Sequence, residues 1–427
     1  MPRGYAGAIE PASLPVLDLG VNLSRMADAG EVRRKGWVSE VFAAFLKLGL
    51  TSFGGPIAHL GYFRDELVKR RGWLSDDAYA ELVALCQFLP GPASSQVGFA
   101  LGLQRAGALG GLAAWTAFTL PSAFLLVLFA YLADSLQGEV GQGLVHGLKL
   151  VAVVIVAQAL LGMAHALCPD RKRAAIALAA LALVTLLTSA FGQVLAILAG
   201  AAAGMTLMAR TDDTTAPALA FPVSRRVGFA ALVLFALLLF GLPLLNGIAG
   251  TGAMEHADIF YRAGALVFGG GHVVLPLLQA GTVEQGLVSS DVFLAGYGAA
   301  QAVPGPLFTF AAYLGAVMQG APSGVAGAAL ALVFIFLPGI LLLVGVLPFW
   351  AAIRKFPLAA SAIKGANAAV VGILAAALYH PVFTTGVLSP LDFAVAATAF
   401  MLLVLWKLPP WMVVVFCALS GVLMAAV

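Results

Sequence analysis

The sequence predicts an all-α, polytopic integral membrane protein with two inverted-topology repeats that contain broken or re-entrant helical hairpins. Three observations predict this class: extreme hydrophobicity, motifs that recur at a near-constant offset, and cations that alternate between loops. Of the 427 residues, 61% are hydrophobic and only 10% are charged, and the mean hydropathy is +1.00. Soluble domains carry about 25% charged residues, so the bilayer must solvate much of this chain.

Three pairs of motifs establish the repeat. They are Phe53-Gly54-Gly55 with Phe268-Gly269-Gly270, Gln87 through Pro92 with Gln301 through Pro306, and Leu120-Pro121 with Leu337-Pro338. The shared order and the near-constant offset in residue number indicate a duplicated unit. The predicted organisation is a cytoplasmic N-terminal segment (1–40), a first repeat (41–210), a linker with a crossover transmembrane helix (211–257) and a second repeat (258–427).

Lysine and arginine fall in opposite phase in the two repeats. Loops 61–77, 168–173 and 351–364 carry cations, whereas loops 134–144, 281–292 and 380–391 carry none. Cations mark cytoplasmic loops, so the second repeat is predicted to be inverted. An apolar segment at 227–247 would supply the odd crossing. The N-terminus is then cytoplasmic and the C-terminus periplasmic.

The apolar segments differ in kind. Segments 108–133, 145–167, 227–247 and 322–348 are each long enough to span about 30 Å of hydrocarbon. The runs 174–208 and 391–427 are expected to turn near Phe191-Gly192 and at Lys407 through Pro410. Segments 41–60, 78–104, 259–280 and 292–318 contain central glycine and proline motifs, which predict broken or re-entrant hairpins reaching the middle of the membrane.

These breaks are the predicted substrate site. Glycine and proline leave backbone groups unpaired, and such groups are tolerated at bilayer depth only inside protein or beside a watery cavity. Half-helix N-termini attract anions, and paired interrupted segments indicate a transporter site. The candidate residues here are Gly54, Gly55, Pro56, Gln87, Pro90, Gly91, Pro92, Ser94, Ser95, Gly269, Gly270, Gly271, Gln301, Pro304, Gly305, Pro306 and Thr309.

Two roles remain open for the polar groups at the breaks. Hydroxyls such as those of Ser95 and Thr309, and the amide of Gln96, can donate to an oxyanion, or they can cap helix starts. Half-helix C-termini present carbonyls at the same breaks. Gln87 and Gln301 can donate to these carbonyls, or the carbonyls can hold a coupling cation or proton.

Two cations interrupt apolar runs at equivalent places. Lys47 lies seven residues before Gly54, and Arg262 lies seven residues before Gly269. A charge in a membrane segment indicates function by default, here attraction of the anion, although snorkelling to an interface is the alternative. His59 and His272 follow the glycine motifs, and both proton handling and a hydrogen-bonded structural role are open for them.

Other classes of function are disfavoured. The net charge of +3 is spread over loops and gives no case for nucleic-acid binding. Cys86, Cys168 and Cys417 are far apart, which predicts neither a disulfide nor a metal site, and no cofactor motif is found. Residues 1–40 lack the apolar stretch of a signal peptide. An enzyme such as a membrane-embedded reductase is therefore not expected.

The motifs resemble the chromate ion transporter family in its long-chain, two-domain form. The matching residues are Phe53 through Leu60, Arg64, Glu66, Arg70 through Leu74, Gln87 through Pro92, Phe268 through His272 and Ala300 through Phe308. The resemblance covers about residues 38–427. It implies a bacterial inner-membrane carrier that exports chromate and confers resistance, with sulfate as a further substrate or competitor.

The resemblance leaves alternatives open. A sulfate or other oxyanion transporter would use the same site, and an anion channel also fits the broken helices. A dianion leaving a negative interior gains about 4.6 kcal/mol per 100 mV, twice the value for one charge, which favours export. The coupling ion and the oligomeric state, a homodimer included, are not fixed by the sequence.

Overall fold

The computed structural model describes residues 36–133, 138–187, 190–208, 221–268, 271–353 and 356–426, and these form helices and connecting loops without a β-strand. Residues 1–35 of the predicted N-terminal segment lie outside them, as do Gly269, Gly270 and residues 209–220 of the predicted linker. Within the described part, five helices are long and apolar enough to cross a membrane. The all-α, multi-pass prediction is confirmed.

The first repeat begins with interrupted helices. Its elements are α2 (Val38–Thr51), α3 (Gly55–Phe63), the π-helix η1 (Arg64–Arg70), α4 (Asp76–Phe88), α5 (Ala93–Ala133), α6 (Glu139–Leu167), α7 (Arg171–Leu186) and α8 (Ala190–Leu207). Helix α5 is interrupted at Ala106 and Gly107, where the backbone leaves helical geometry. It therefore comprises two helices, as the separate segments 78–104 and 108–133 predicted.

The second repeat follows the linker helix α9 (Arg225–Ala249). Its elements are α10 (Gly252–Ala265), η2 (Gly271–Val273), α11 (Val274–Thr282), α12 (Ser290–Ala300), η3 (Leu307–Thr309), α13 (Phe310–Val317), α14 (Gly324–Val346), η4 (Leu347–Phe349), α15 (Trp350–Ile353), α16 (Pro357–Ala377), η5 (Leu378–Phe383), α17 (Thr384–Gly386), α18 (Pro390–Val404) and α19 (Pro410–Ala425). The predicted turn at Lys407 through Pro410 separates α18 from α19.

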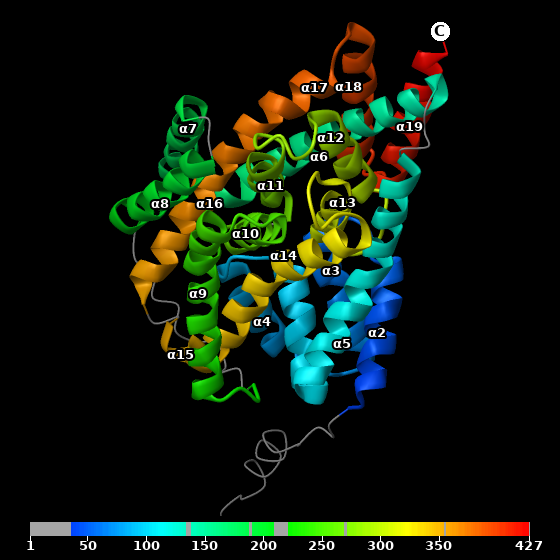
Figure 1. Cartoon of the computed structure of the whole chain (residues 1–427). Helices are drawn as coiled ribbons and strands as arrows, with labels where there is room; N and C mark the ends of the chain where they lie inside the picture. The colour runs from blue at the N-terminus through cyan, green and yellow to red at the C-terminus, as the bar shows by residue number, and fades with distance from the viewer. Residues whose placement is uncertain are drawn as a thin grey trace, which may run out of the picture. The chain divides into compact units, whose positions relative to one another are not determined.

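The two repeats exchange their last helices. Helices α7 and α8 of the first repeat pack along α16 of the second, and α18 and α19 of the second pack along α6 of the first (Figure 1). Small residues permit these crossings, because a Cβ on Gly204 would collide with Ser361 and one on Gly147 would collide with Cys417. Such reciprocal packing is what a twofold relation between two copies produces.

The first helices of each repeat pack in matching pairs. Helix α2 lies along α5, and α10 and α13 lie along α14. Phe45, Phe63 and Phe118 form an edge-to-face aromatic group between α2, α3 and α5, with ring centroids 5.1–6.5 Å apart. This packing holds the helices on each side of the breaks.

Candidate functional site

All four predicted breaks are interruptions of helix in the structure. Helix stops after Thr51 and resumes at Gly55, stops after Phe88 and resumes at Ala93, stops after Ala265 and resumes at Gly271, and stops after Ala300 and resumes at Leu307. We call these breaks 1 to 4 in chain order. Gly54, Gly91 and Gly305 have φ of +97°, +121° and +103°, a region that L side chains avoid.

Two backbone hydrogen bonds join the breaks across the repeats. The Gly91 N–H of break 2 donates to the Val267 carbonyl of break 3 at 2.7 Å, and the Gly305 N–H of break 4 donates to the Ser52 carbonyl of break 1 at 2.9 Å. The repeat offset of the sequence motifs relates Gly91 to Gly305 and Ser52 to Val267. The bonds are therefore equivalent, and the four breaks meet about one pseudo-twofold axis.

Breaks 1, 3 and 4 also approach one another through residues that follow them. A Cβ on Gly55 would lie 3.9 Å from His272 Nε2, and a Cβ on Gly271 would lie 3.1 Å from Pro56 Cγ and 3.9 Å from Leu307 Cβ. Pro56 occupies the first turn of α3, where its missing N–H costs no hydrogen bond. The starts of α3, η2 and η3 thus face one another.

Matching close approaches seat breaks 2 and 4 on the long helices. A Cβ on Gly91 would lie 3.1 Å from Gly339 Cα in α14, and one on Gly305 would lie 2.8 Å from Ser122 Oγ in α5. Ser122 and Gly339 each follow the repeated leucine-proline motif directly, so they occupy equivalent positions in the two repeats. Each break therefore lies against the long helix of the other repeat.

Gln96 connects break 2 to α14. Its side-chain amide donates to the Pro90 carbonyl at 3.1 Å and to the Gly339 carbonyl at 2.9 Å. Gln87, one of the two glutamines that the sequence offered as possible donors to such carbonyls, is exposed. Gln96 follows the proline-glycine-proline motif by four residues, and that position is the signal that identifies it.

Three hydroxyls near the breaks lack a partner among the described residues. Ser52, Ser95 and Thr119 are 0%, 5% and 0% exposed, and no hydrogen bond to their side-chain oxygens is formed. Burying a hydroxyl without a partner costs free energy, which makes these groups candidates for contact with a ligand. Ser52 and Thr119 sit in apolar surroundings in the sequence, and sequence reasoning missed them.

Other residues that the sequence predicted for the site differ in hydrogen bonding and in burial. The Thr309 hydroxyl donates to the Pro306 carbonyl at 2.7 Å and so caps its own turn, which is the alternative that the sequence left open. Ser94 and Pro304 are buried, whereas Pro90 and Gln301 are half-buried.

The two histidines differ in their surroundings. His59 is 0% exposed and packs its ring edge-to-face against Phe118, with the centroids 5.3 Å apart. His272 Nδ1 lies 2.9 Å from the Tyr297 hydroxyl. A hydrogen-bonded structural histidine therefore describes His272, while proton handling by either histidine stays a prediction.

Both predicted cations are paired with carboxylates. Lys47 Nζ lies 2.8 Å from Glu66 Oε2, and Arg262 forms an ion pair with Asp258 one helical turn away. Glu66 belongs to a different motif from Lys47, so the sequence did not identify it as a partner. Asp258 lies four residues before Arg262, the spacing of a helical ion pair, and that spacing is the signal that could have identified it. Lys47 and Arg262 are thus compensated by the chain itself.

Glu66 is the centre of a larger cationic group. Its Oε2 also accepts from Arg70 at 2.9 Å, and its Oε1 accepts from Arg71 at 2.9 Å. Burial alone would raise the pKa of Glu66, but the hydrogen bonds from Lys47, Arg71 and Arg70 outweigh it and lower the pKa from 4.5 to about 2. Glu66 lies in η1, outside the five candidate spans.

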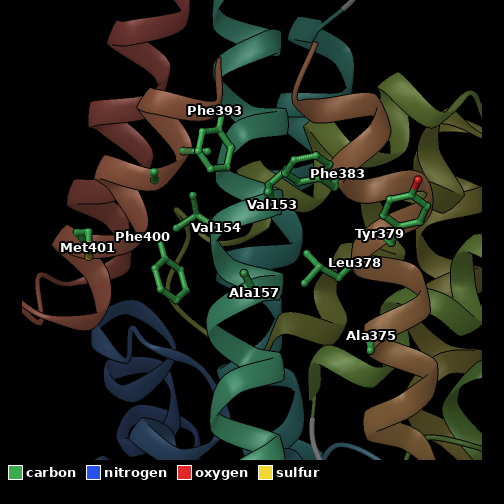
Figure 2. Close-up of a pocket in the computed structure, with 12 residues that line it drawn as sticks. Val153, Val154, Ala157, Ala375, Leu378, Tyr379, Phe383, Phe393, Phe400 and Met401 are labelled. Atoms are coloured by element: carbon green, nitrogen blue, oxygen red, sulfur yellow. The ribbon is translucent and has the colours of Figure 1, made fainter. Parts of the chain in front are cut away.

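A separate apolar pocket lies between α6, α16 with η5, and α18 (Figure 2). Its volume is about 570 Å³, and valine, alanine, leucine, phenylalanine, tyrosine and methionine side chains line it. Such a lining offers no charge to an anion. In the described part of the chain, no group of three or more His, Cys, Asp or Glu residues could hold a metal ion.

The sequence of this chain is similar to that of proteins in one known family. A family model described as "Chromate transporter" matches residues 39–205 and 254–422. A probable chromate transport protein of Synechococcus elongatus is 30% identical over 395 residues, covering 89% of this chain and 93% of that protein. The chromate transport protein of Cupriavidus metallidurans is 28% identical over 88% of this chain and 90% of its own length. No solved structure matches the chain.

Proposed function

Because the chain belongs to the chromate transporter family, we propose that it carries chromate across the membrane as a secondary transporter, at the point where breaks 1 to 4 meet. The pair of equivalent backbone hydrogen bonds, Gly91 to Val267 and Gly305 to Ser52, carries this assignment. These bonds gather four interrupted helices from two repeats around one point, which is the arrangement of transporter sites.

The chemistry of the breaks suits a tetrahedral dianion. Chromate presents acceptors and no obligatory donor, so it needs N–H groups, hydroxyls and positive ends of helices. The N-termini of α3 and α5 supply helix-dipole charge. The unpartnered hydroxyls of Ser52, Ser95 and Thr119 supply donors without breaking an existing hydrogen bond.

The direction that we assign is export from the cytoplasm across a bacterial inner membrane, with resistance to chromate as the consequence. A dianion gains about 4.6 kcal/mol per 100 mV on leaving a negative interior, twice the value for a single charge. Export therefore needs no coupling ion, whereas uptake would need at least two compensating cations. The cytoplasmic N-terminus and periplasmic C-terminus belong to the same proposal.

Flux in proteoliposomes tests the function. The purified protein is reconstituted, and radiolabelled chromate flux is measured with the membrane potential and the pH gradient set independently. We expect saturable flux that follows the potential, shows counterflow and leaves chromate unreduced. Sulfate flux exceeding chromate flux would reassign the substrate, absence of saturation and counterflow would indicate a channel, and reduced chromium would indicate an enzyme.

Variants at the breaks test the site. Ser52→Ala and Thr119→Val remove unpartnered hydroxyls and are expected to raise the chromate concentration for half-maximal flux. Thr398→Val is the control, because its exposed hydroxyl donates to the Ala394 carbonyl within α18, away from the breaks. If all three substitutions change half-saturation equally, the hydroxyls of Ser52 and Thr119 do not bind the substrate.

A further inference from the structure

Each repeat neutralises its equivalent cation with a buried carboxylate. Lys47 and Arg262 are related by the same offset as breaks 1 and 3. Glu66, the partner of Lys47, is 7% exposed, and Asp258, the partner of Arg262, is 2% exposed. The two cations are only about half-buried, with side-chain exposures of 49% and 47%. In both repeats, the carboxylate is buried and the cation is partly exposed to solvent.

The two acids do not occupy equivalent positions. By the offset that relates the two cations, the counterpart of Glu66 is Gly281 and the counterpart of Asp258 is Ala43. Glu66 reaches Lys47 from η1, whereas Asp258 lies on α10 with Arg262 itself. The duplicated unit therefore holds a cation at a fixed place, and each repeat provides its counter-ion in a different way.

The charges around Glu66 match a dianion. Lys47, Arg70 and Arg71 contact the one carboxylate, so the group carries three positive charges and one negative charge. The remaining charge of +2 equals the charge that chromate or sulfate would neutralise. Around Asp258, the Oδ2 atom pairs with Arg262, and Oδ1 has no partner among the described residues.

We infer that Glu66 and Asp258 are surrogate anions, carboxylates that hold Lys47 and Arg262 until a travelling oxyanion takes their place beside the cation. This inference rests on the proposed function. On the proposed inverted topology, the two pairs lie on opposite sides of the breaks, so one serves the entering anion and the other the leaving anion. Both acids are positioning residues, because they act through the cations.

Exchange of one anion for another explains why the acids are present. A cation left bare beside a buried region is costly, so a carboxylate keeps Lys47 compensated when no substrate is bound. The same carboxylate competes with the substrate and prevents three cations from retaining a dianion. A site that conducts must release its ligand as well as bind it.

Glu66→Gln tests the inference in the reconstituted full-length protein. Removing the carboxylate charge raises the net charge around Lys47 from +2 to +3. We expect the half-saturation concentration of chromate to fall about tenfold or more, because one charge within 4 Å is removed, and the maximal flux to fall because release slows. Lys47→Met lowers the net charge of the group to +1 and is expected to raise half-saturation. The double variant keeps Arg70 and Arg71 without Glu66, a net charge of +2, and its half-saturation is expected to lie between those of the two single variants.

Asp258→Asn provides the second arm, measured for flux starting from the opposite face. It is expected to lower the half-saturation concentration for flux from that face. Half-saturation for flux starting on the side of Glu66 should not change. Asp170→Asn is the matched control, because Asp170 forms an exposed ion pair with Arg173 at the start of α7. It should change neither half-saturation nor maximal flux.

The outcomes separate this inference from the proposed function. The surrogate role is overturned if the wild-type protein transports chromate but the half-saturation concentration of folded Glu66→Gln is unchanged or raised. The proposed transport function is unaffected by that result. A wild-type protein that moves neither chromate nor sulfate overturns both. If Glu66→Gln fails to fold, Glu66→Asp carries the test, since it withdraws the carboxylate by one methylene. Lower half-saturation supports the role, and any other result contradicts it.

Discussion

Gly305→Ala is the most direct probe of the junction between the repeats. Gly305 donates its N–H to the Ser52 carbonyl at 2.9 Å, and its φ is +103°. An alanine Cβ there would lie 2.8 Å from Ser122 Oγ and 3.3 Å from the Phe118 carbonyl oxygen. The substitution therefore has two effects: it strains the backbone at Gly305, and it pushes break 4 away from α5.

The magnitude follows from these two effects. A non-glycine residue held in such a region of φ costs about 1–3 kcal/mol, and overpacking at a close contact costs about 1–3 kcal/mol more. Gly305→Ala should then destabilise the protein by about 2–6 kcal/mol. Gly138→Ala is the matched control: its φ is +108°, but its Cβ would meet nothing within 4 Å, so only the strain of about 1–3 kcal/mol applies.

Thermal unfolding of the detergent-purified protein and chromate flux measure the outcome. We expect Gly305→Ala to unfold at a lower temperature than Gly138→Ala and to lose flux, while Gly138→Ala retains flux. Adding Ser122→Ala removes the 2.8 Å contact and should restore part of the stability. Equal stability and equal flux in Gly305→Ala and Gly138→Ala would refute the claim that the junction depends on this close approach.

Three further outcomes are expected. Gly204→Leu should destabilise the crossing of α8 and α16 by at least about 1–3 kcal/mol, because a Cβ there meets Ser361, whereas Gly162→Leu, with nothing within 4 Å, should unfold like the wild type. Gln96→Leu should cost about 1–3 kcal/mol by removing the amide hydrogen bonds to the Pro90 and Gly339 carbonyls, measured by the same unfolding assay, and a Gln96→Leu protein that unfolds like the wild type would show that these bonds do not stabilise the junction. The pKa of Glu66 is lowered from 4.5 to about 2, so its contribution to stability is complete above pH 4.5 and is lost as pH falls toward 2. Unfolding temperature should accordingly fall more steeply over that range in the wild type than in Glu66→Gln, and parallel curves would contradict the ion-pair assignment.

The breaks could be predicted from sequence because they depend on local chemistry. Closely grouped glycine and proline, as in Gly54-Gly55-Pro56 and Pro90-Gly91-Pro92, interrupt helices, whereas the isolated Pro121, Pro243 and Pro338 lie inside α5, α9 and α14. The repeat offset identified which interruptions correspond. The paired hydrogen bonds of Gly91 and Gly305 then follow from the symmetry of the two copies.

Partners that depend on tertiary packing could not be predicted. The spacing of Gly200 and Gly204 indicates a helix crossing, but nothing in it identifies α16 of the other repeat as the partner. Lys47 stands out as a cation in an apolar run, yet its acid lies 19 residues away in a different helix. The interpretation of Lys47 as a cation that attracts the anion missed its partner Glu66 for that reason.

The backbone of the junction is symmetric, but its unpartnered hydroxyls, those of Ser52, Ser95 and Thr119, come from the first repeat. Ser52, Ser95, Gln96 and Thr119 correspond, by the offsets of the nearest motifs, to Val267, Thr309, Phe310 and Phe336. Three of these four positions are apolar in the second repeat, and the hydroxyl of the fourth caps its own turn. An anion held by these hydroxyls would therefore be bound by side chains of the first repeat. The symmetric backbone would allow access from both sides, while the asymmetric side chains would fix where the anion rests.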